Sequence, residues 1–319
     1  MGWKREGRLR QLIIEVVCGQ RVWGCKSQEQ VCQNVLSSLS TVIIGAVAVA
    51  TFFSWPALAQ QRPLLTEDPE SVGSGLVRIE GGFDYVRDQI YPVSGLEGHR
   101  FRVPTAGVTI GVSSIAEIQI DGISYQSLNV TSRAEAPLSR LLQFSGDTTY
   151  DMDDIVVGAK ARVLSEGRRR PAVALRFSTR LPNAGNESGL GLDTTDFVNT
   201  LLVGKTLGSV RVVGNVGLGI LGDPTRGDRQ NDVLMYGVSL TRVITNAIHF
   251  VAEVNGYANT RRGSPPPGTD SSSYFRTGAR YSRGSIHFDA ALVSGLTSRD
   301  ASVGLTAGLS WVFQGMEVP

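Results

Sequence analysis

Cysteine is scarce in this chain of 319 residues, and its three positions, Cys18, Cys25 and Cys32, all lie near the start. Their spacing of seven contains no C-x-x-C pair, which gives little support to a zinc site. Residues 60–319 contain no cysteine, so no disulfide can form within them. A small secreted domain held together by disulfides is therefore excluded.

A strong charge of one sign is also lacking, because the formal net charge is +2. Six of the 31 Lys and Arg and three of the 29 Asp and Glu precede residue 60, which leaves a formal charge of −1 for residues 60–319. This balance points to neither a nucleic acid nor an acidic partner.

No apolar run reaches the length of about 20 residues that a membrane-spanning helix needs. The densest run, Thr41–Phe53, has 13 residues, follows six basic residues, and precedes Pro56 and the small-x-small stretch Ala57-Leu58-Ala59. This order is typical of a secretory signal peptide. We expect residues 1–59 to be a leader, cleaved after Ala59, that exports the chain to the outer membrane of a Gram-negative-type bacterium. An uncleaved membrane anchor is the alternative.

A helical period is missing from residue 75 onward. Runs of about ten residues rich in Val, Ile, Leu, Gly and aromatics recur instead, separated by turn-forming residues. This pattern predicts twelve β-strands, at 75–87, 99–112, 116–129, 154–164, 171–181, 194–206, 209–220, 232–242, 248–259, 273–282, 285–296 and 302–313.

The connections between these runs alternate in length. Short ones follow the even-numbered strands, and generally longer, polar ones follow the odd-numbered strands, the longest being 130–153 and 260–272. In an up-and-down sheet, all tight turns and both termini would then lie at one end and all long loops at the other. Bacterial outer-membrane barrels have this asymmetry, with short periplasmic turns and long external loops.

The two faces of each strand differ in chemistry. In 209–220, for example, Val210, Val212 and Leu218 share one face while Arg211 and Asn215 share the other. A small soluble barrel could show the same alternation, but twelve strands enclose more space than such side chains fill. We therefore expect an all-β, transmembrane, up-and-down antiparallel β-barrel of about twelve strands, apolar side toward lipid. Strand 116–129 changes phase, which predicts a bulge near Gly122.

The last predicted strand ends in TAGLSWVF, Thr306 to Phe313. It resembles the C-terminal recognition signal of outer-membrane barrels, with Thr306, Gly308, Trp311 and Phe313 in the pattern polar-x-Gly-x-x-aromatic-x-aromatic. The resemblance implies the barrel assembly machinery as a partner. We thus expect a short periplasmic segment at 60–74, the barrel at 75–313 and a tail at 314–319.

Three stretches, 62–85, 153–164 and 251–313, resemble the outer-membrane family named for transporters of the meta pathway of phenol degradation. The resemblance depends on strand and turn patterns and covers most of residues 62–313. It implies passage of small molecules, aromatic ones among them, and supplies no binding residue.

The expected register turns a set of polar side chains into the lumen. As a functional set, their facing rows of Arg and carboxylate would orient and filter a solute. As a structural set, they would form an ion-paired network that plugs the barrel. Both interpretations stay open, and the residues are Arg78, Glu80, Asp84, Glu117, Gln119, Asp121, Lys160, Arg162, Arg176, Arg180, Arg211, His249, Glu253, Asn255, Arg276, Arg280, His287 and Asp289.

We therefore expect a passive channel for small solutes, aromatic or hydrophobic ones included, with outer-membrane lipid around it and no cofactor, metal or nucleic acid. Two alternatives remain, a lipase-like membrane hydrolase and a plugged barrel that serves as scaffold or surface receptor. A hydrolase would need a catalytic histidine, and His249 and His287 lack the sequence surroundings of one. Asp151, Asp153 and Asp154 could bind calcium but fit a solvated loop better.

Overall fold

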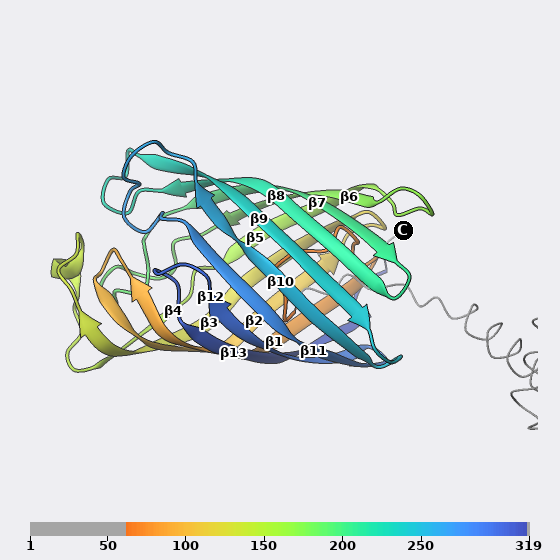
Figure 1. Ribbon diagram of the computed structural model, residues 1–319, viewed down its shortest axis with the longest axis horizontal. Coiled ribbons are helices and arrows are strands. Elements are labelled where there is room, and N and C mark those ends of the chain that lie inside the picture. The colour runs from red at the N-terminus through yellow and green to blue at the C-terminus, as the bar shows by residue number, and fades with distance from the viewer. Residues whose placement is uncertain (1–61, 318–319) are drawn as a thin grey trace, which may run out of the picture. The chain divides into compact units, whose positions relative to one another are not determined.

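A computed structural model describes residues 62–317, which form a single antiparallel β-barrel (Figure 1). The leader, its cysteines and the predicted cleavage site lie outside the described residues. The elements are β1 (Leu76–Tyr91), β2 (Leu96–Gly111), β3 (Ala116–Arg133), η1 (Ser139–Leu141), β4 (Thr148–Met152), β5 (Val156–Leu164), β6 (Ala172–Arg180), β7 (Asp196–Leu207), β8 (Val210–Gly222), β9 (Gln230–Val243), β10 (Ile248–Asn259), β11 (Ser272–Arg283), β12 (Ile286–Gly295) and β13 (Val303–Gln314).

The barrel closes because β1 pairs with both β2 and β13, so that neither edge of the sheet is left open. β4 and β5 pair in turn with successive parts of β3 and together occupy one position in the wall. The wall therefore has twelve strand positions, as the sequence predicted. Closure pairs the backbone groups between strands, which a sheet in hydrocarbon requires.

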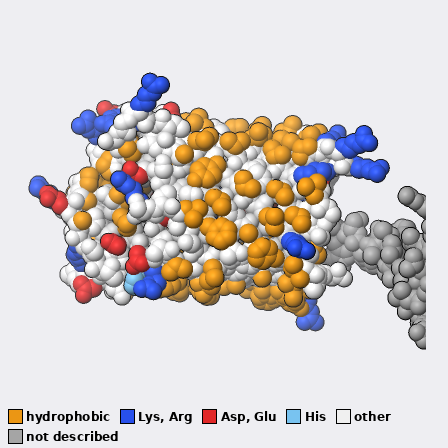
Figure 2. Space-filling model, in the orientation of Figure 1, with side chains coloured by type: hydrophobic (Ala, Val, Ile, Leu, Met, Phe, Trp, Pro, Cys, Tyr) orange, Lys and Arg blue, Asp and Glu red, His pale blue; other side chains and the backbone are white. Residues whose placement is uncertain are grey.

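The outer wall is apolar, because every second side chain of each strand points away from the lumen. Phe177 on β6 is 59% exposed and Leu218 on β8 is 48% exposed, whereas Lys160 on β5 is 2% exposed. Figure 2 shows hydrophobic side chains covering the wall between two ends that carry most of the charged ones. This confirms the predicted orientation, apolar side outward and ionic side inward.

The predicted phase change in β3 is a bulge at Gly122. The β2–β3 ladder shifts register between Ala106–Ile123 and Val108–Ile120, and Gly122 has a φ of +79°. Its α-carbon lies against the Asp154 carbonyl, where a Cβ would approach within 2.3 Å. Glycine is therefore required at this point, where β4 gives way to β5.

The long loops cover one end of the barrel. The loop after β1 meets the loops before β4 and after β6 through the Leu138 N–H to Val93 carbonyl bond and the Ser94 hydroxyl to Gly189 carbonyl bond. Beneath them, the start of β2 and the end of β3 join the loop after β6 in a small apolar core of Leu96, Leu128, Val130 and Leu190.

The opposite end has the tight turns and both ends of the barrel sequence (Figure 1). Beyond β13, the N–H groups of Gly315 and Met316 donate to the Gly75 carbonyl just before β1. The start of the C-terminal tail is thereby fixed beside the first strand. Among residues 62–317, no helix has the length and apolar character needed to cross a membrane.

Candidate functional site

Residues 62–74, here called the N-terminal segment, lie inside the barrel rather than beside it. Figure 1 shows this stretch in orange within the half of the barrel that holds the tight turns. Three of its buried residues, Leu64, Thr66 and Val72, are at most 5% exposed. The segment hydrogen-bonds or pairs with groups on β2, β3, β5, β6, β8, β10, β11, β12 and β13.

Glycines that face the lumen make room for the segment. A Cβ on Gly237 of β9 would lie 2.7 Å from the Thr66 hydroxyl, and one on Gly204 of β7 would lie 2.8 Å from the Pro69 ring. These separations are shorter than van der Waals contact, so larger residues at Gly204 and Gly237 would meet the segment directly. Two more strands therefore border the segment.

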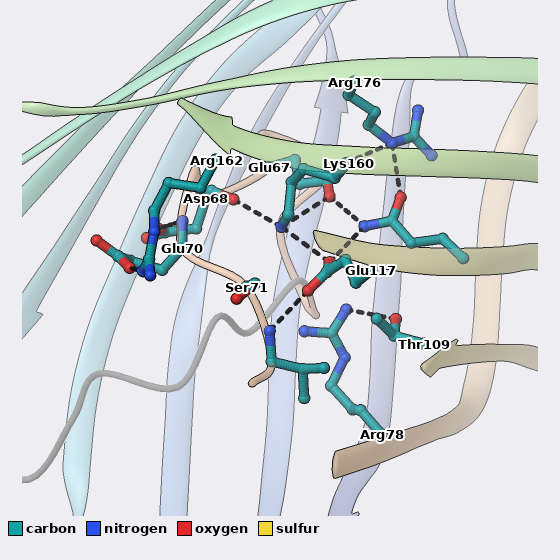
Figure 3. A network of polar contacts seen from close by, with 12 residues as sticks. Glu67, Asp68, Glu70, Ser71, Arg78, Thr109, Glu117, Lys160, Arg162 and Arg176 are labelled. Atoms are coloured by element: carbon teal, nitrogen blue, oxygen red, sulfur yellow. Dashed lines mark hydrogen bonds and ion pairs between the residues drawn. The ribbon is translucent and has the colours of Figure 1, made fainter. Parts of the chain in front are cut away.

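Glu67 is the centre of the polar network in Figure 3. Its carboxylate lies 3.1 Å from the Lys160 ammonium and 2.6 Å from the Arg176 guanidinium, and it accepts a hydrogen bond from the Gln119 amide. With its own amide oriented to suit both groups, Asn215 of β8 bonds the Glu67 backbone N–H and carbonyl at 2.7 and 3.0 Å. Four strands thus hold one residue of the segment.

Lys160 has a partner for each of its three N–H donors. Its ammonium lies 2.9 Å from the Glu117 carboxylate, 3.1 Å from that of Glu67 and 2.9 Å from the Asp68 carbonyl. Figure 3 shows it between Glu67 and Glu117. Two of these three partners belong to the segment, so a buried cation of the wall is satisfied mainly by the segment.

The other acidic residues of the segment pair in the same way. The Arg211 guanidinium of β8 binds both carboxylate oxygens of Asp68, one of them at 2.7 Å, and Arg162 of β5 binds Glu70. Arg211 also lies 2.8 Å from Glu166 in the β5–β6 turn. Each carboxylate of the segment therefore contacts at least one cation of the wall.

Residues of the opposite wall bind the hydrogen-bond donors of the segment. The Glu253 carboxylate of β10 accepts the backbone N–H of Leu65 at 2.8 Å and that of Thr66 at 2.7 Å. The Arg62 guanidinium lies 3.6 Å from Asp289 of β12 and donates to the Thr105 hydroxyl at 2.7 Å. The segment thus spans the lumen from β5, β6 and β8 to β10 and β12.

The remaining predicted lumen residues also lie on the inner face of their strands, where most of them pair. Arg78 donates to Thr109 and lies 3.6 Å from Glu80, and Arg276 lies 3.1 Å from Glu253. Their positions do not by themselves give them a role in transport. The set comprises Asp84 with Arg100 and Arg102, Asp121 with Arg176, Arg180 with Asp154 and Asp196, Asn255 with Arg276, Arg280 with the Arg62 carbonyl, His287 with Ser282, and the half-buried His249.

A cavity of about 260 Å³ lies at the other end of the barrel, under the long loops. Three tyrosines, Tyr91, Tyr257 and Tyr274, line it together with charged residues that include Arg100 and Asp300. The cavity has polar and aromatic walls, which suits a small solute that combines both characters. The sequence did not predict all the cations and carboxylates at this end. Arg100 and Arg102 precede a register shift in β2, so alternation along that strand did not place them in the lumen.

The four residues of the predicted C-terminal signal divide between the two faces of β13. The rings of Trp311 and Phe313 lie 4.3 Å apart, with Trp311 44% exposed on the outer wall. Thr306 faces inward and accepts a hydrogen bond from Arg62 at 3.2 Å, and Gly308 leaves space for the same guanidinium. Recognition of these residues during assembly stays a prediction.

The hydrolase alternative requires a catalytic histidine. His287 Nδ1 lies 2.9 Å from the Ser282 hydroxyl, and its Nε2 has no hydrogen-bond partner among the described residues. A Ser–His pair of this kind lacks the carboxylate that orients the imidazole in a triad.

The aspartates of the predicted loop each have partners of their own. Asp151 accepts from Ser188 and Gly185, Asp153 pairs with Arg102, and Asp154 accepts from two backbone N–H groups. Residues 62–317 contain no group of three or more His, Cys, Asp or Glu placed to hold a metal ion.

Comparison with known proteins places the fold. The chain is similar to a solved outer membrane channel from Pseudomonas putida F1, at 12% identity over 77% of this chain and 98% of that one, with a TM-score of 0.53. The fold is that of an outer-membrane β-barrel. The NanC porin matches at 12% identity over 74% and 98%, TM-score 0.45, and the Pseudomonas putida toluene transporter TodX at 9% over 82% and 95%, TM-score 0.40. No family model and no curated protein matches the chain.

Proposed function

We propose that this protein is a passive channel of the outer membrane that admits small solutes when the N-terminal segment leaves the lumen. The proposal rests on one observation, that the N-terminal segment lies inside the lumen. Its bonds run mainly to side chains of the lumen wall, and Arg176, Arg211 and Glu253 are joined through it rather than to one another. The barrel wall closes without it, so the segment is removable in principle.

The ion pairs that hold the segment in the lumen do not prevent its release. When the segment leaves, water fills the lumen and each released charge is rehydrated. The net free energy that keeps the segment in place is then far below the sum of its ion pairs. A reversible exchange between a closed and an open lumen is the physical basis of the channel.

The solute class that we propose begins from the predicted family, whose name suggests aromatic molecules. The tyrosines of the outer cavity support an aromatic solute, because aromatic rings stack on one another. Export through a cleaved leader and insertion by the barrel assembly machinery complete the proposal, with outer-membrane lipid around the wall.

A disulfide between the segment and the wall tests the proposal. A Cβ at Gly237 would lie 3.5 Å from the Cβ of Thr66, within the range of about 3.5–4.5 Å that a disulfide spans. The variant is Thr66→Cys/Gly237→Cys in a chain whose Cys18, Cys25 and Cys32 are replaced by Ser. Its conductance is measured in planar bilayers before and after reduction, with the two single-cysteine variants as controls.

We expect the oxidised form to stay closed and the reduced form to open. Equal currents in both forms would show that the segment does not gate the lumen. Absence of current from both forms and from a chain lacking residues 62–72 would instead favour the plugged scaffold or receptor.

A further inference from the structure

Four cations form a row on one wall of the lumen, Lys160 and Arg162 on β5, Arg176 on β6 and Arg211 on β8. Lys160 and Arg176 lie directly opposite each other in the β5–β6 ladder. Like charges in facing positions destabilise a sheet unless an anion lies between them. The wall is therefore built around anions.

In the closed lumen, those anions are carboxylates of the N-terminal segment. Around Glu67, an ammonium, a guanidinium and an amide N–H converge on one carboxylate, and Gln119 and Lys160, which supply two of these donors, are at most 2% exposed. Asp68 accepts two hydrogen bonds from Arg211, the geometry in which guanidinium recognises carboxylate. The wall thus has formed sites for carboxylates, occupied by a tethered one.

Departure of the segment changes the charge of the lumen. The segment carries three carboxylates, Glu67, Asp68 and Glu70, and one guanidinium, Arg62, so the lumen loses two net negative charges. The carboxylates that remain beside the row pair with three of its members, Glu117 with Lys160, Asp121 with Arg176 and Glu166 with Arg211.

Arg162 then has no carboxylate partner among the described residues, and the row keeps a net positive charge. The facing wall is balanced, because Glu253 keeps Arg276 and Asp289 lies opposite Arg280 in the β11–β12 ladder. A transverse field across a narrow lumen therefore favours anions on the side of β5, β6 and β8.

We propose that the solutes of this channel are organic anions whose carboxylates bind the row of Lys160, Arg162, Arg176 and Arg211, in the places that the segment's carboxylates hold when the lumen is closed. The proposal rests on the channel function proposed above. It also accounts for both the ionic lumen and the aromatic outer cavity, because an aromatic acid has a carboxylate for the first and a ring for the second.

The test uses a chain that lacks residues 62–72, which the proposed function expects to be open. Its zero-current potential is measured across a KCl gradient whose dilute side is about 0.01 M, where the Debye length is about 30 Å and fixed charges act at full reach. A second variant adds Arg162→Gln/Arg176→Gln/Arg211→Gln. A matched control adds Arg168→Gln/Arg169→Gln/Arg170→Gln, three exposed arginines in the β5–β6 turn. Heat-modifiable migration in gels verifies that each barrel is folded.

We expect chloride to permeate several-fold better than potassium in the open chain and in the control. In the lumen variant the preference for chloride should be lost or reversed, because Glu117, Asp121 and Glu166 then outnumber Lys160. Benzoate should block the chloride current, and the neutral benzamide should not. An unselective or cation-selective current in the chain that lacks only residues 62–72 would overturn the inference while leaving the channel intact. So would a preference for chloride that survives the lumen substitutions. Absence of current from the chain without its segment would overturn the channel itself, and the inference with it.

Discussion

The Glu67 carboxylate lies 3.1 Å from the Lys160 ammonium, although the two residues are 93 positions apart in the chain. One belongs to the N-terminal segment and the other to the middle of β5. The contact joins the element that we propose to leave the lumen to the wall that stays in place. The balance between closed and open states is therefore expected to respond to this pair.

Replacing Glu67 by Gln should open the channel more often. The amide keeps the size of the side chain but removes the charge that Lys160 and Arg176 share. Loss of one charge-assisted hydrogen bond costs about 2 kcal/mol, which is roughly a 30-fold rise in the ratio of open to closed channels. Single-channel recording measures that ratio. Glu135→Gln in an exposed loop is the control, and an unchanged ratio in Glu67→Gln would contradict the gating role of the pair.

The closed state should tolerate mild acid. Burial raises the pKa of the Glu67 carboxyl, but the charges of Lys160 and Arg176 outweigh it and lower the pKa from 4.5 to about 2. A carboxyl whose pKa is depressed in the bound state stabilises that state fully above its ordinary pKa, and the stabilisation is lost as the pH falls toward the depressed value.

We therefore expect the open fraction to stay constant from pH 7 to the ordinary pKa of 4.5 and to rise as the pH approaches about 2. The measurement is open probability against pH in planar bilayers. Glu67→Gln should lack the part of this rise that belongs to Glu67. A rise centred near neutral pH would show that other groups control the segment.

A side chain at Gly237 should displace the segment without altering any charge. The Cβ of Gly237→Val would meet Thr66, and overpacking of this kind costs on the order of 1–3 kcal/mol. The expected result is a higher open fraction with an unchanged barrel. Gly214→Val is the matched control, because a Cβ there meets open space. Equal open fractions in the two variants would show that the segment does not need the space at Gly237.

A charged side chain on the outer wall should destabilise the barrel. Phe177 is 59% exposed on the lipid-facing side of β6, so Phe177→Arg would place a guanidinium in hydrocarbon. We expect the free energy of unfolding from lipid vesicles to fall by about 2–4 kcal/mol, the cost of Arg near the bilayer midplane. Phe177→Leu should change it little. Equal stability of the two variants in urea titrations would mean that this face does not contact lipid.

The twelve strand positions and their facing directions were predictable because both follow from local patterns. Alternation fixes which side chains share a face, and the lengths of the connections fix which ends lie together. The bulge at Gly122 was visible for the same reason, as a break in the alternation. β4 was missed, because its residues lie in the stretch predicted as the loop 130–153 and five residues are too few to show a clear alternation. The structure pairs it with the later part of β3, in line with β5.

The contents of the lumen could not be predicted in the same way. The N-terminal segment has no strand or helix period, and its partners lie far along the chain, Glu253 being 187 positions from Thr66. The sequence showed a row of inward cations and a stretch of acidic residues before the first strand, but local patterns do not join them. The lumen glycines Gly204 and Gly237 were a further signal, since they leave space that no wall residue fills.

The short link between the segment and β1 limits how far the segment can travel. Gly73 and Gly75, both with positive φ, stand on either side of Ser74, and β1 begins one residue later. A released segment therefore remains tethered at the mouth of the pore, at an effective concentration on the order of millimolar. Its return is a unimolecular event whose rate does not depend on how many copies the membrane holds. In the channel that we propose, each opening is therefore reversed by the same molecule that opened.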